Sequence, residues 1–514
     1  MEKLQKAAKK ILKLIADKRE TEAEDKILSF QGEKNNTRLE LICGLISYAQ
    51  INREYDVVNT ALNAFERLKA KIPKDKRDKS LYYDVANGYQ TLFELTILND
   101  YSKAFECEKI IENAIHYFEK ALGSNPNAYT NYGSLYDHIG RPVEAIDYYE
   151  KALKLDKDFG MALGNIALAL EILAPVSRYR NVYLIYAYQF YQSALKNKES
   201  IKKNAGEEAI TFFQKHSDRI ASAFKENGKE EMLTKNLAHE HYKKSTLSPF
   251  VKFYTEFCVE NNLYINLHRS DKPSEGSIED SLFPVLITGN EENERQYVED
   301  IAFRFNEISE AYMTARMALV QSQYPNPDFS AISEQTTLVN NLDYSVSNIY
   351  VGHLKTAYKE ACSVLDKIAV LINHYLKLGH SEDSVYYHTV WFEPQPRDST
   401  EESVLSQKVK DEPWLLGLFL LCREFRGSRS SQLRNALTHK YVRLYRAVDG
   451  SKGTYSFEEM TEITIDVFYK VRCAIMYLSL FISRKELSNK KDAKGIILDM
   501  PIYTGQDLDI WEKI

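Results

Sequence analysis

Hydrophobic positions recur along most of this 514-residue chain at three- and four-residue intervals, the spacing of one face of an α-helix. The clearest stripe predicts a helix from about Val346 to Leu378 that stops at Gly379. Its apolar positions are Leu354, Ala357, Ala361, Leu365, Ile368 and Ile372. Further helices are predicted at Gln296–Val320, Trp414–Phe425 and Phe457–Arg484. Only 13 prolines and 20 glycines interrupt these patterns, so we predict an all-α protein.

A repeated pattern lies within the N-terminal half. Residues Ala128–Phe159 resemble a tetratricopeptide repeat, with small and aromatic residues at that repeat's spacing: Gly133, Tyr136, Gly140, Ala145, Tyr149 and Ala152. A similar unit precedes it, with a first helix at Tyr82–Leu95 and an insertion around Asn99–Glu108. A degenerate pair follows at Met161–Leu170 and Tyr186–Ala194. Because fewer than about three repeats cannot bury a core, we predict a solenoid of roughly three to five helical pairs.

Changes in composition suggest four regions. The change near Thr246 leads into a polar loop with prolines and glycine, which we expect to be mobile. The predicted regions are a tetratricopeptide-like domain at 1–230, a helical connection at 231–345 with a mobile loop near 269–280, a helical bundle at 346–485, and a C-terminal extension at 486–514. The apolar part of this extension could add a strand or a docking segment. By analogy with other solenoids, the repeats would bind a protein or peptide segment in their groove, or serve only as a scaffold or dimerisation arm.

The stretch Ser430–Val448 is predicted to form an amphipathic helix with two distinct faces. The apolar face, which should be buried, carries Leu433, Ala436, Leu437, Leu444 and Ala447. The opposite face carries Asn435, His439, Val442 and Arg446, with Arg434 on the border. Asn435 and His439 are one turn apart and therefore neighbours on the surface. A guanidinium, an amide and an imidazole on one helix can handle a phosphate group, although such residues are also common on solvated faces.

Basic residues concentrate around this stretch. Between positions 423 and 446, seven basic residues stand against Glu424 alone, a local excess of six positive charges: Arg423, Arg426, Arg429, Arg434, Lys440, Arg443 and Arg446. The whole chain has a net charge of −6, so the asymmetry is marked. Such a cluster is expected where a polyanion docks.

Composition limits the class of protein. The longest apolar runs, such as Trp414–Cys422 and Ala474–Ile482, are shorter than the roughly 20 residues that span a bilayer, so we expect no membrane partner. The N-terminal segment is a charged amphipathic helix without the apolar centre of a signal peptide. Six scattered cysteines without a Cys-x-x-Cys pair indicate reduced core residues in a cytoplasmic protein, with neither disulfides nor a metal site.

Arg434, His439 and Tyr441 stand in the spacing Arg-x4-His-x-Tyr, with Asn435 directly after the arginine. This spacing resembles the motif of the HEPN superfamily of helical nucleases. The segments LDKIAVLINHYLKLG, VYYHTVWF and LRNALTHKY are similar to the HEPN family found behind tetratricopeptide repeats in bacterial conflict and defence proteins. The resemblance covers about Thr246–Arg484 and implies a HEPN four-helix bundle behind the solenoid.

This resemblance implies a metal-independent endoribonuclease without a cofactor, whose site forms at the two-fold interface of a homodimer. The ribose 2′-hydroxyl would attack the phosphate and leave 2′,3′-cyclic phosphate ends, so DNA would be inert. A neutral imidazole can move the proton near pH 7, and an arginine can stabilise the phosphorane. Because uncontrolled RNA cleavage is toxic, we expect a gated effector of anti-phage defence or toxin-like stress response, with the repeats as its sensor.

Carried onto this sequence, the resemblance assigns phosphate binding to Arg434 and acid–base catalysis to His439. Asn435 would hold the substrate or orient His439. Asp366 could support the site from the neighbouring helix, but an exposed ion pair is the role we favour for it. Tyr441 matches a tyrosine that some HEPN toxins carry as a target of nucleotidyl modification. In a regular helix it falls on the apolar stripe, so we predict a core position.

A second hypothesis keeps the fold without catalysis. The protein would then be an inactive HEPN-like RNA- or nucleotide-binding adaptor whose repeats recruit a protein partner. The two hypotheses differ in whether substitution of His439 abolishes cutting without abolishing binding. The basic cluster disfavours a purely structural scaffold. The sequence also has no Gly-x4-Gly-Lys-Ser/Thr loop, Gly-x-Ser-x-Gly elbow, Gly-x-Gly-x-x-Gly motif after a strand or His-Glu-x-x-His motif.

Overall fold

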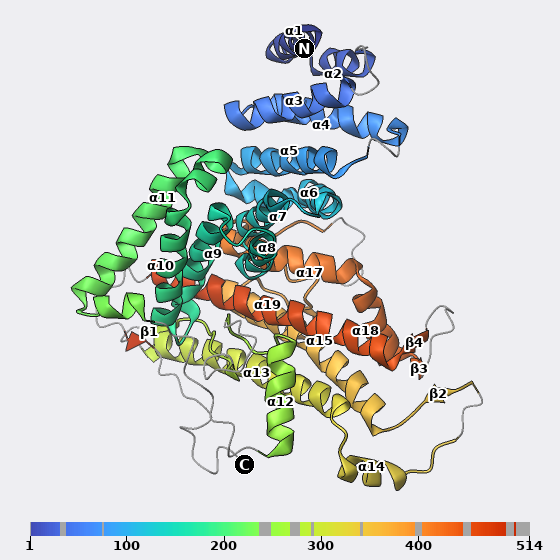
Figure 1. Ribbon diagram of the computed structural model, residues 1–514. Helices are drawn as coiled ribbons and strands as arrows, with labels where there is room; N and C mark the ends of the chain where they lie inside the picture. Colours follow the sequence, from blue (N-terminus) through green and yellow to red (C-terminus); the bar gives the residue numbers. More distant parts are fainter. Residues whose placement is uncertain are drawn as a thin grey trace. The chain divides into compact units, whose positions relative to one another are not determined.

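The computed structural model describes residues 2–30, 37–73, 77–235, 248–267, 278–288, 292–339, 343–395, 403–445, 454–489 and 498–499. For Arg429 and His439 it describes the backbone alone. The chain divides into two compact units, the first made of 1–172, 184–234 and 410–416, and the second of 173–183, 235–409 and 417–514. Both are built from helices, with a few short strands in the second (Figure 1), which confirms the predicted all-α class.

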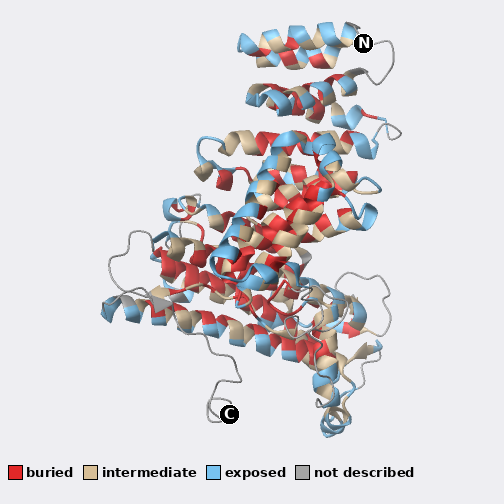
Figure 2. Ribbon diagram, turned by 60° about the vertical axis from the view of Figure 1, so that its left-hand side comes forward, coloured by how far each residue is buried: buried red, intermediate tan, exposed pale blue. Residues whose placement is uncertain are grey.

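The first unit is a series of paired helices. These are α1 (Glu2–Ala16), α2 (Glu20–Ser29), α3 (Thr37–Asn52), α4 (Tyr55–Leu68), α5 (Lys79–Ile97), α6 (Glu108–Ala121), α7 (Pro126–His138), α8 (Pro142–Leu155), α9 (Gly160–Leu173), α10 (Arg180–Lys196) and α11 (Lys198–Glu226). Helix α3 packs against α4, α5 against α6, and α7 against α8, and these pairs follow one another along the unit (Figure 1). Buried and exposed positions alternate along the helices (Figure 2), as their amphipathic patterns predict. The predicted insertion between α5 and α6 contains the short 3-10 helix η3 (Tyr101–Glu106).

The clearest predicted repeat folds as α7 and α8. Asn125 caps α7 by accepting a hydrogen bond from the Asn127 backbone, and a proline opens each helix, where its missing N–H is not needed. Gly140 forms the turn between the helices at φ +77°, a conformation that favours glycine. A Cβ on Gly133 would lie 2.6 Å from the Tyr149 ring, so the small residue is required for the close approach of the pair.

Asp137 of α7 is enclosed by this pair of helices. The Tyr149 hydroxyl donates to Oδ2 at 2.5 Å, whereas Oδ1 is buried without a hydrogen-bond partner in the described part of the chain. Burial raises the pKa of Asp137 from its ordinary 3.8 to about 7, against the opposing effects of Tyr149 and His138. In the unfolded chain this carboxyl loses its proton near pH 3.8, whereas in the folded protein it keeps the proton up to about pH 7. The protonated carboxyl therefore makes its full contribution to stability below about pH 4, and this contribution declines as the pH rises towards 7.

We therefore expect Asp137→Asn to stabilise the first unit at pH 7.5 and to do so much less at pH 5.0, because asparagine does not ionise. The gain is at most about 4 kcal/mol, since one pKa unit corresponds to about 1.4 kcal/mol. Thermal unfolding at the two pH values measures it. Asp158→Asn, which replaces an exposed carboxylate between α8 and α9, is the control. An equal pH dependence of Asp137→Asn and wild type would contradict the shifted pKa.

Three long helices form the frame of the second unit: α13 (Glu292–Gln323), α15 (Ile349–Leu376) and α19 (Phe457–Asn489). Helix α15 packs against both others (Figure 1). The shorter helices are α12 (Pro249–Glu260), α14 (Pro327–Glu334), α16 (Gln407–Lys410), α17 (Leu416–Gly427) and α18 (Arg429–His439). The four helices predicted in this half are all present. Helix α15 ends slightly before the predicted stop, because Lys377 already has a left-handed backbone (φ 52°).

The described residues of the second unit also form five short strands: β1 (Ile287–Thr288), β2 (Ser345–Val346), β3 (Arg443–Tyr445), β4 (Thr454–Ser456) and β5 (Leu498–Asp499). In one sheet β3 lies between β2, to which it is antiparallel, and β4, to which it is parallel. In the other, β1 pairs antiparallel with β5. The apolar tail of the predicted C-terminal extension therefore does add a strand.

The predicted mobile loop near 269–280 is held at its C-terminal end. Residues 268–277 lie outside the described residues. Asp280, however, accepts hydrogen bonds from Arg316 of α13 on both carboxylate oxygens, at 2.8 and 2.7 Å. Arg316 also donates to the Tyr254 hydroxyl and to the Leu263 carbonyl, and its side chain is 3% exposed. Asp280, the last residue of this loop, is therefore anchored to α13, because a buried guanidinium requires the carboxylate as its partner.

Candidate functional site

The motif helix is shorter than predicted. Helix α18 is capped by the Ser428 hydroxyl, which accepts from the Ser431 backbone, and it ends at His439. Lys440 then has an extended backbone (φ −138°, ψ 178°), and the chain continues into β3. The predicted single helix over 430–448 is therefore wrong for residues 440–445, and residues 446–448 lie outside the described part of the chain. Strand pairing of β3 and a 2.6 Å hydrogen bond from Lys355 of α15 to the Val442 carbonyl outweigh the local helical pattern.

The change from helix to extended chain relocates the residues after His439, because side-chain directions repeat every two residues in a strand and every 3.6 in a helix. Tyr441, predicted in the core, is fully exposed. Val442, predicted on the solvated face, is buried. Leu433 and Leu444 are buried as predicted. Tyr441 is therefore no part of the hydrophobic core.

Arg434 is fixed by residues from two other segments. Its Nη2 donates to Asp366 Oδ2 of α15 at 2.5 Å, and the two side chains are 24% and 20% exposed. Its guanidinium carbon lies 5.7 Å from the centre of the Tyr387 ring. The Tyr387 backbone N–H donates to the other oxygen of Asp366 at 3.1 Å. Asp366 therefore forms an ion pair, which was the favoured prediction, but the pair joins two helices and is only partly exposed.

Electrostatics keep this arginine charged. Burial opposes the charge, but the attraction and hydrogen bond of Asp366 outweigh it, so the pKa of Arg434 lies above its usual value. Cys362 is close enough to feel the Arg434 charge, but burial raises the pKa of its thiol to about 12. A thiol with that pKa stays protonated near neutral pH and is a poor nucleophile. The arrangement thus offers a fixed cation without a reactive cysteine.

Two serines at the start of α18 attach the helix to its neighbours. The Tyr358 hydroxyl of α15 donates to the Ser430 carbonyl at 2.5 Å. The hydroxyls of Tyr387 and Ser431 lie 3.3 Å apart, within hydrogen-bond distance. The position of Arg434, one turn further on, is therefore set by contacts on both sides of the helix.

The other residues of the predicted site lie along the same helix. Asn435 is exposed, next to Arg434. His439 is the last residue of α18, one turn beyond Asn435, and its side chain lies outside the described part of the structure. The structure thus places Arg434, Asn435 and the His439 backbone on one short helix and brings Asp366 to it.

The predicted basic patch is only partly described. Arg426 and Lys440 are exposed, and Arg423 is half-buried. Arg443 is paired with Asp343 at 2.6 Å, so its charge is partly compensated. The side chain of Arg429 and the whole of Arg446 lie outside the described residues.

The structure adds His388, which sequence reasoning missed as a site residue. It lies in the turn that also carries Tyr387, and its ring centre is 5.1 Å from that of Tyr387. Burial lowers the pKa of His388, as do the charges of Arg426 and Arg434, whereas Asp366 opposes the shift. The sequence gives little indication that His388 belongs to the site. It lies among aromatic residues in a segment without helical spacing, so its spatial neighbours cannot be predicted.

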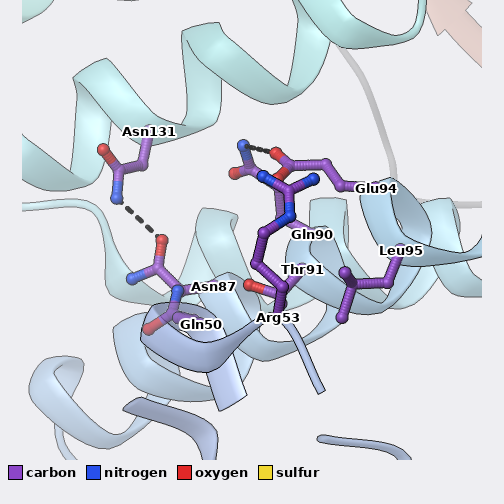
Figure 3. A pocket seen from close by; sticks show the side chains of 8 residues that line it. All are labelled: Gln50, Arg53, Asn87, Gln90, Thr91, Glu94, Leu95 and Asn131. Atoms are coloured by element: carbon purple, nitrogen blue, oxygen red, sulfur yellow. Dashed lines mark hydrogen bonds between the residues drawn. The ribbon is translucent and has the colours of Figure 1, made fainter. Parts of the chain in front are cut away.

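The first unit holds a separate polar pocket of about 230 Å³, shown in Figure 3. It is lined by Gln50, Arg53, Asn87, Gln90, Thr91, Glu94, Leu95 and Asn131. The Asn131 amide donates to Asn87 Oδ1 at 2.7 Å, and the Gln90 amide donates to Glu94 at 2.9 Å. Gln90 Oε1 is buried without a hydrogen-bond partner in the described part of the chain. The pocket therefore presents amide and charged groups suited to a polar ligand.

The carboxylate in this pocket is ionised. Burial opposes its charge, but His138, which lies 2.8 Å from Glu94, the Gln90 amide and the charge of Arg53 together lower the pKa of Glu94 below its usual value. A donor group of a ligand would find both this carboxylate and the free oxygen of Gln90.

The first unit is a series of paired helices, and the helical bundle of the second unit carries Arg434 on the short helix α18. These features define a helical-repeat protein with a C-terminal helical domain. That domain is of the HEPN type: the family model described as LA2681-like HEPN matches residues 292–485. The model described as Tetratricopeptide repeat matches residues 126–159, the α7–α8 pair. The predicted combination of a tetratricopeptide repeat and a following HEPN domain is confirmed. The match starts with α13 and includes both Arg434 and His439.

No curated protein matches the chain. None of the described helices combines the length and apolarity needed to cross a membrane.

Proposed function

We propose that this protein is a metal-independent endoribonuclease whose site is centred on Arg434 and His439. The observation that carries the proposal is the fixed, charged Arg434 on α18, held by Asp366 and Tyr387 inside a HEPN domain and followed by His439 at the end of the same helix. Asp366 uses one guanidinium nitrogen and orients the group. Within the described residues no other hydrogen bond of this guanidinium is formed, so its remaining N–H groups can bind a phosphate. Arg434 is thus a preorganised anion-binding group.

In this mechanism the ribose 2′-hydroxyl oxygen bonds to the adjacent phosphorus, and the bond from phosphorus to the 5′-oxygen of the next nucleotide breaks. The products carry a 2′,3′-cyclic phosphate and a 5′-hydroxyl. Arg434 stabilises the negative charge that builds on the phosphorane oxygens. His439 accepts the hydroxyl proton or supplies one to the leaving oxygen. Asn435, exposed beside Arg434, contacts the substrate.

The proposal includes a homodimer through the HEPN domain, which brings the α18 helices of two protomers together. Two copies of His439 could then act as base and acid, and the basic residues of both protomers would line one RNA path. Sedimentation of the protein as a monomer at micromolar concentration would contradict this composite site.

The repeats would control the nuclease in defence or stress response by binding a protein segment. The pocket at Asn87, Gln90 and Glu94 supports this role, because it offers the unsatisfied oxygen of Gln90 and the carboxylate of Glu94 to a ligand. An uncontrolled nuclease would be toxic to its host, so we propose that the free protein cuts RNA slowly and that binding at this pocket raises the rate. Easy overexpression of a wild type that is already fully active would contradict this control.

The experiment that tests the nuclease compares wild type with His439→Ala on single-stranded RNA and on the matching DNA, with metals chelated. We expect wild type to cut RNA but not DNA and to leave cyclic phosphate ends. We expect His439→Ala to lower the rate at least about 100-fold, as is typical for loss of a general acid–base group. His116→Ala, which replaces an exposed histidine of the first unit, is the control. Equal cutting by His439→Ala and wild type would identify a contaminant or another site.

The same experiment separates the second candidate function. The pairing of Arg434 with Asp366 also suits a binding domain without catalysis, because it partly neutralises the cation. If wild type and His439→Ala bind RNA alike and neither cuts it, the protein is an RNA- or nucleotide-binding adaptor.

A further inference from the structure

An exposed aromatic surface lies next to Arg434. Tyr386 is 43% exposed, and its ring is nearly parallel to that of His388, with 15° between the planes and 5.8 Å between the centres. The Tyr387 ring lies edge-on to His388 on one side and contacts the Arg434 guanidinium on the other. Residues 386–388 thus connect an exposed aromatic ring with the Arg434 guanidinium, the proposed phosphate-binding group.

The backbone of this turn is held rigidly. The Trp391 indole donates to the Tyr387 carbonyl at 2.7 Å, and Trp391 itself is buried against Phe419. The backbone N–H groups of Thr389 and Val390 both donate to the Tyr386 carbonyl. Because the turn is fixed at both ends, the exposed Tyr386 ring is a preorganised surface, and a ligand that stacks on it need not order the backbone.

His388 contacts the neighbouring rings but lacks a hydrogen bond to any described residue. In the described part of the chain neither ring nitrogen makes a hydrogen bond, and Nδ1 is buried. A buried polar atom without a partner is unfavourable and is uncommon in folded proteins. Because the ring nitrogens make no hydrogen bond within the described residues, they remain for a ligand. Its lowered pKa keeps the imidazole neutral near pH 7, so it offers one donor and one acceptor.

We propose that Tyr386 and His388 form a nucleobase subsite that holds one unpaired base of a single-stranded RNA beside the phosphate bound by Arg434. Tyr386 stacks on the face of the base, His388 bonds to its edge, and the exposed Arg426 attracts the phosphate backbone. The identification of the ligand as RNA rests on the proposed function. A base within a duplex is stacked and paired, so it could not use this surface.

The test measures binding of a labelled ten-nucleotide single-stranded RNA to the full-length protein carrying His439→Ala, so that no cutting occurs. In that background Tyr386→Leu is expected to weaken binding roughly tenfold, because stacking on the aromatic ring is lost. Tyr386→Trp should retain binding, and the added indole should be quenched by the bound base. His388→Gln, which keeps a donor and an acceptor, should bind better than His388→Leu. Tyr55→Leu on α4, where the side chain is 41% exposed, is the matched control and should have no effect.

Two further ligands identify what is recognised. A duplex RNA of the same length should bind with no dependence on Tyr386. A free mononucleotide, which carries both a base and a phosphate, should compete with the labelled RNA. Equal binding by Tyr386→Leu and wild type, with no quenching in Tyr386→Trp, would overturn the subsite. If wild type cuts RNA but Tyr386→Leu binds it normally, the subsite proposal is contradicted and the nuclease proposal is retained. If RNA binding depends on Tyr386 and wild type does not cut RNA, the nuclease proposal is contradicted and the subsite proposal is retained.

Discussion

Arg434→Lys is expected to reduce RNA cleavage about 100-fold while the protein stays folded. The planar guanidinium can keep one nitrogen on Asp366 and direct others at a phosphate. A lysine ammonium is a single point charge on a flexible chain, so its contact with Asp366 competes with its contact to the phosphate. Initial rates on single-stranded RNA with metals chelated, measured at saturating RNA, report the loss.

The matched control is Arg304→Lys on α13. That arginine is 23% exposed and pairs with Asp300 at 3.3 Å, so it has the same exposure and a similar ion pair away from α18. Chemical unfolding should show a loss of about 1 kcal/mol or less for either lysine variant, because the charge is kept. Arg434→Ala would cost about 1–2 kcal/mol, since Asp366 would remain largely buried without its partner. Full activity of Arg434→Lys would show that a charge is sufficient and that the fork geometry has no role.

Asp366→Asn distinguishes orientation from charge. The asparagine oxygen can still accept from the Tyr387 backbone, but it no longer carries the charge that holds Arg434. If Asp366 only aims the guanidinium, cleavage should fall less in Asp366→Asn than in Arg434→Lys. A rate increase would instead show that the ion pair restrains the site.

Asp280→Asn is expected to destabilise the second unit by about 3–5 kcal/mol, as is typical when one partner of a buried ion pair is removed. Arg316 is 3% exposed and surrounded by aromatic rings, and Asp280 receives two of its hydrogen bonds. Asp280 also accepts from the Ile265 backbone, so it joins α13 to the segment that follows α12. Removing its charge leaves a buried guanidinium without a carboxylate. Urea unfolding measured by circular dichroism would report the lower midpoint.

Asp466→Asn on α19 is the control for this effect. Asp466 pairs with Lys470 at 2.8 Å on the helix surface and is 52% exposed, so its loss should change stability by no more than about 0.5 kcal/mol. If Asp280→Asn unfolds at the same urea concentration as this control, the Arg316 pair makes no net contribution to stability.

Local patterns were sufficient for most of the helices. The apolar stripes of α13, α15 and α19 persist over many turns, and each helix satisfies its own backbone hydrogen bonds, so periodicity alone locates them. The α7–α8 repeat could also be predicted, because its glycines, prolines and tyrosines shape the packing of two helices that are adjacent in the chain. The choice of Arg434 and His439 as site residues also came from sequence, but from a resemblance in spacing.

Long-range contacts decided the rest. The end of α18 could not be predicted, because β3 is stabilised by strands from two other segments, and Tyr441 therefore lies in solvent. Asp366 and Arg434 are 68 positions apart, and His388 reaches them through a turn without periodic spacing. Periodicity specifies which face of an element is apolar, whereas only the folded chain determines which polar groups from different elements meet. Local sequence patterns therefore specify the helices, the repeat and the motif. Tertiary packing sets the partners of Arg434, the exposure of Tyr441 and the aromatic surface beside Arg434.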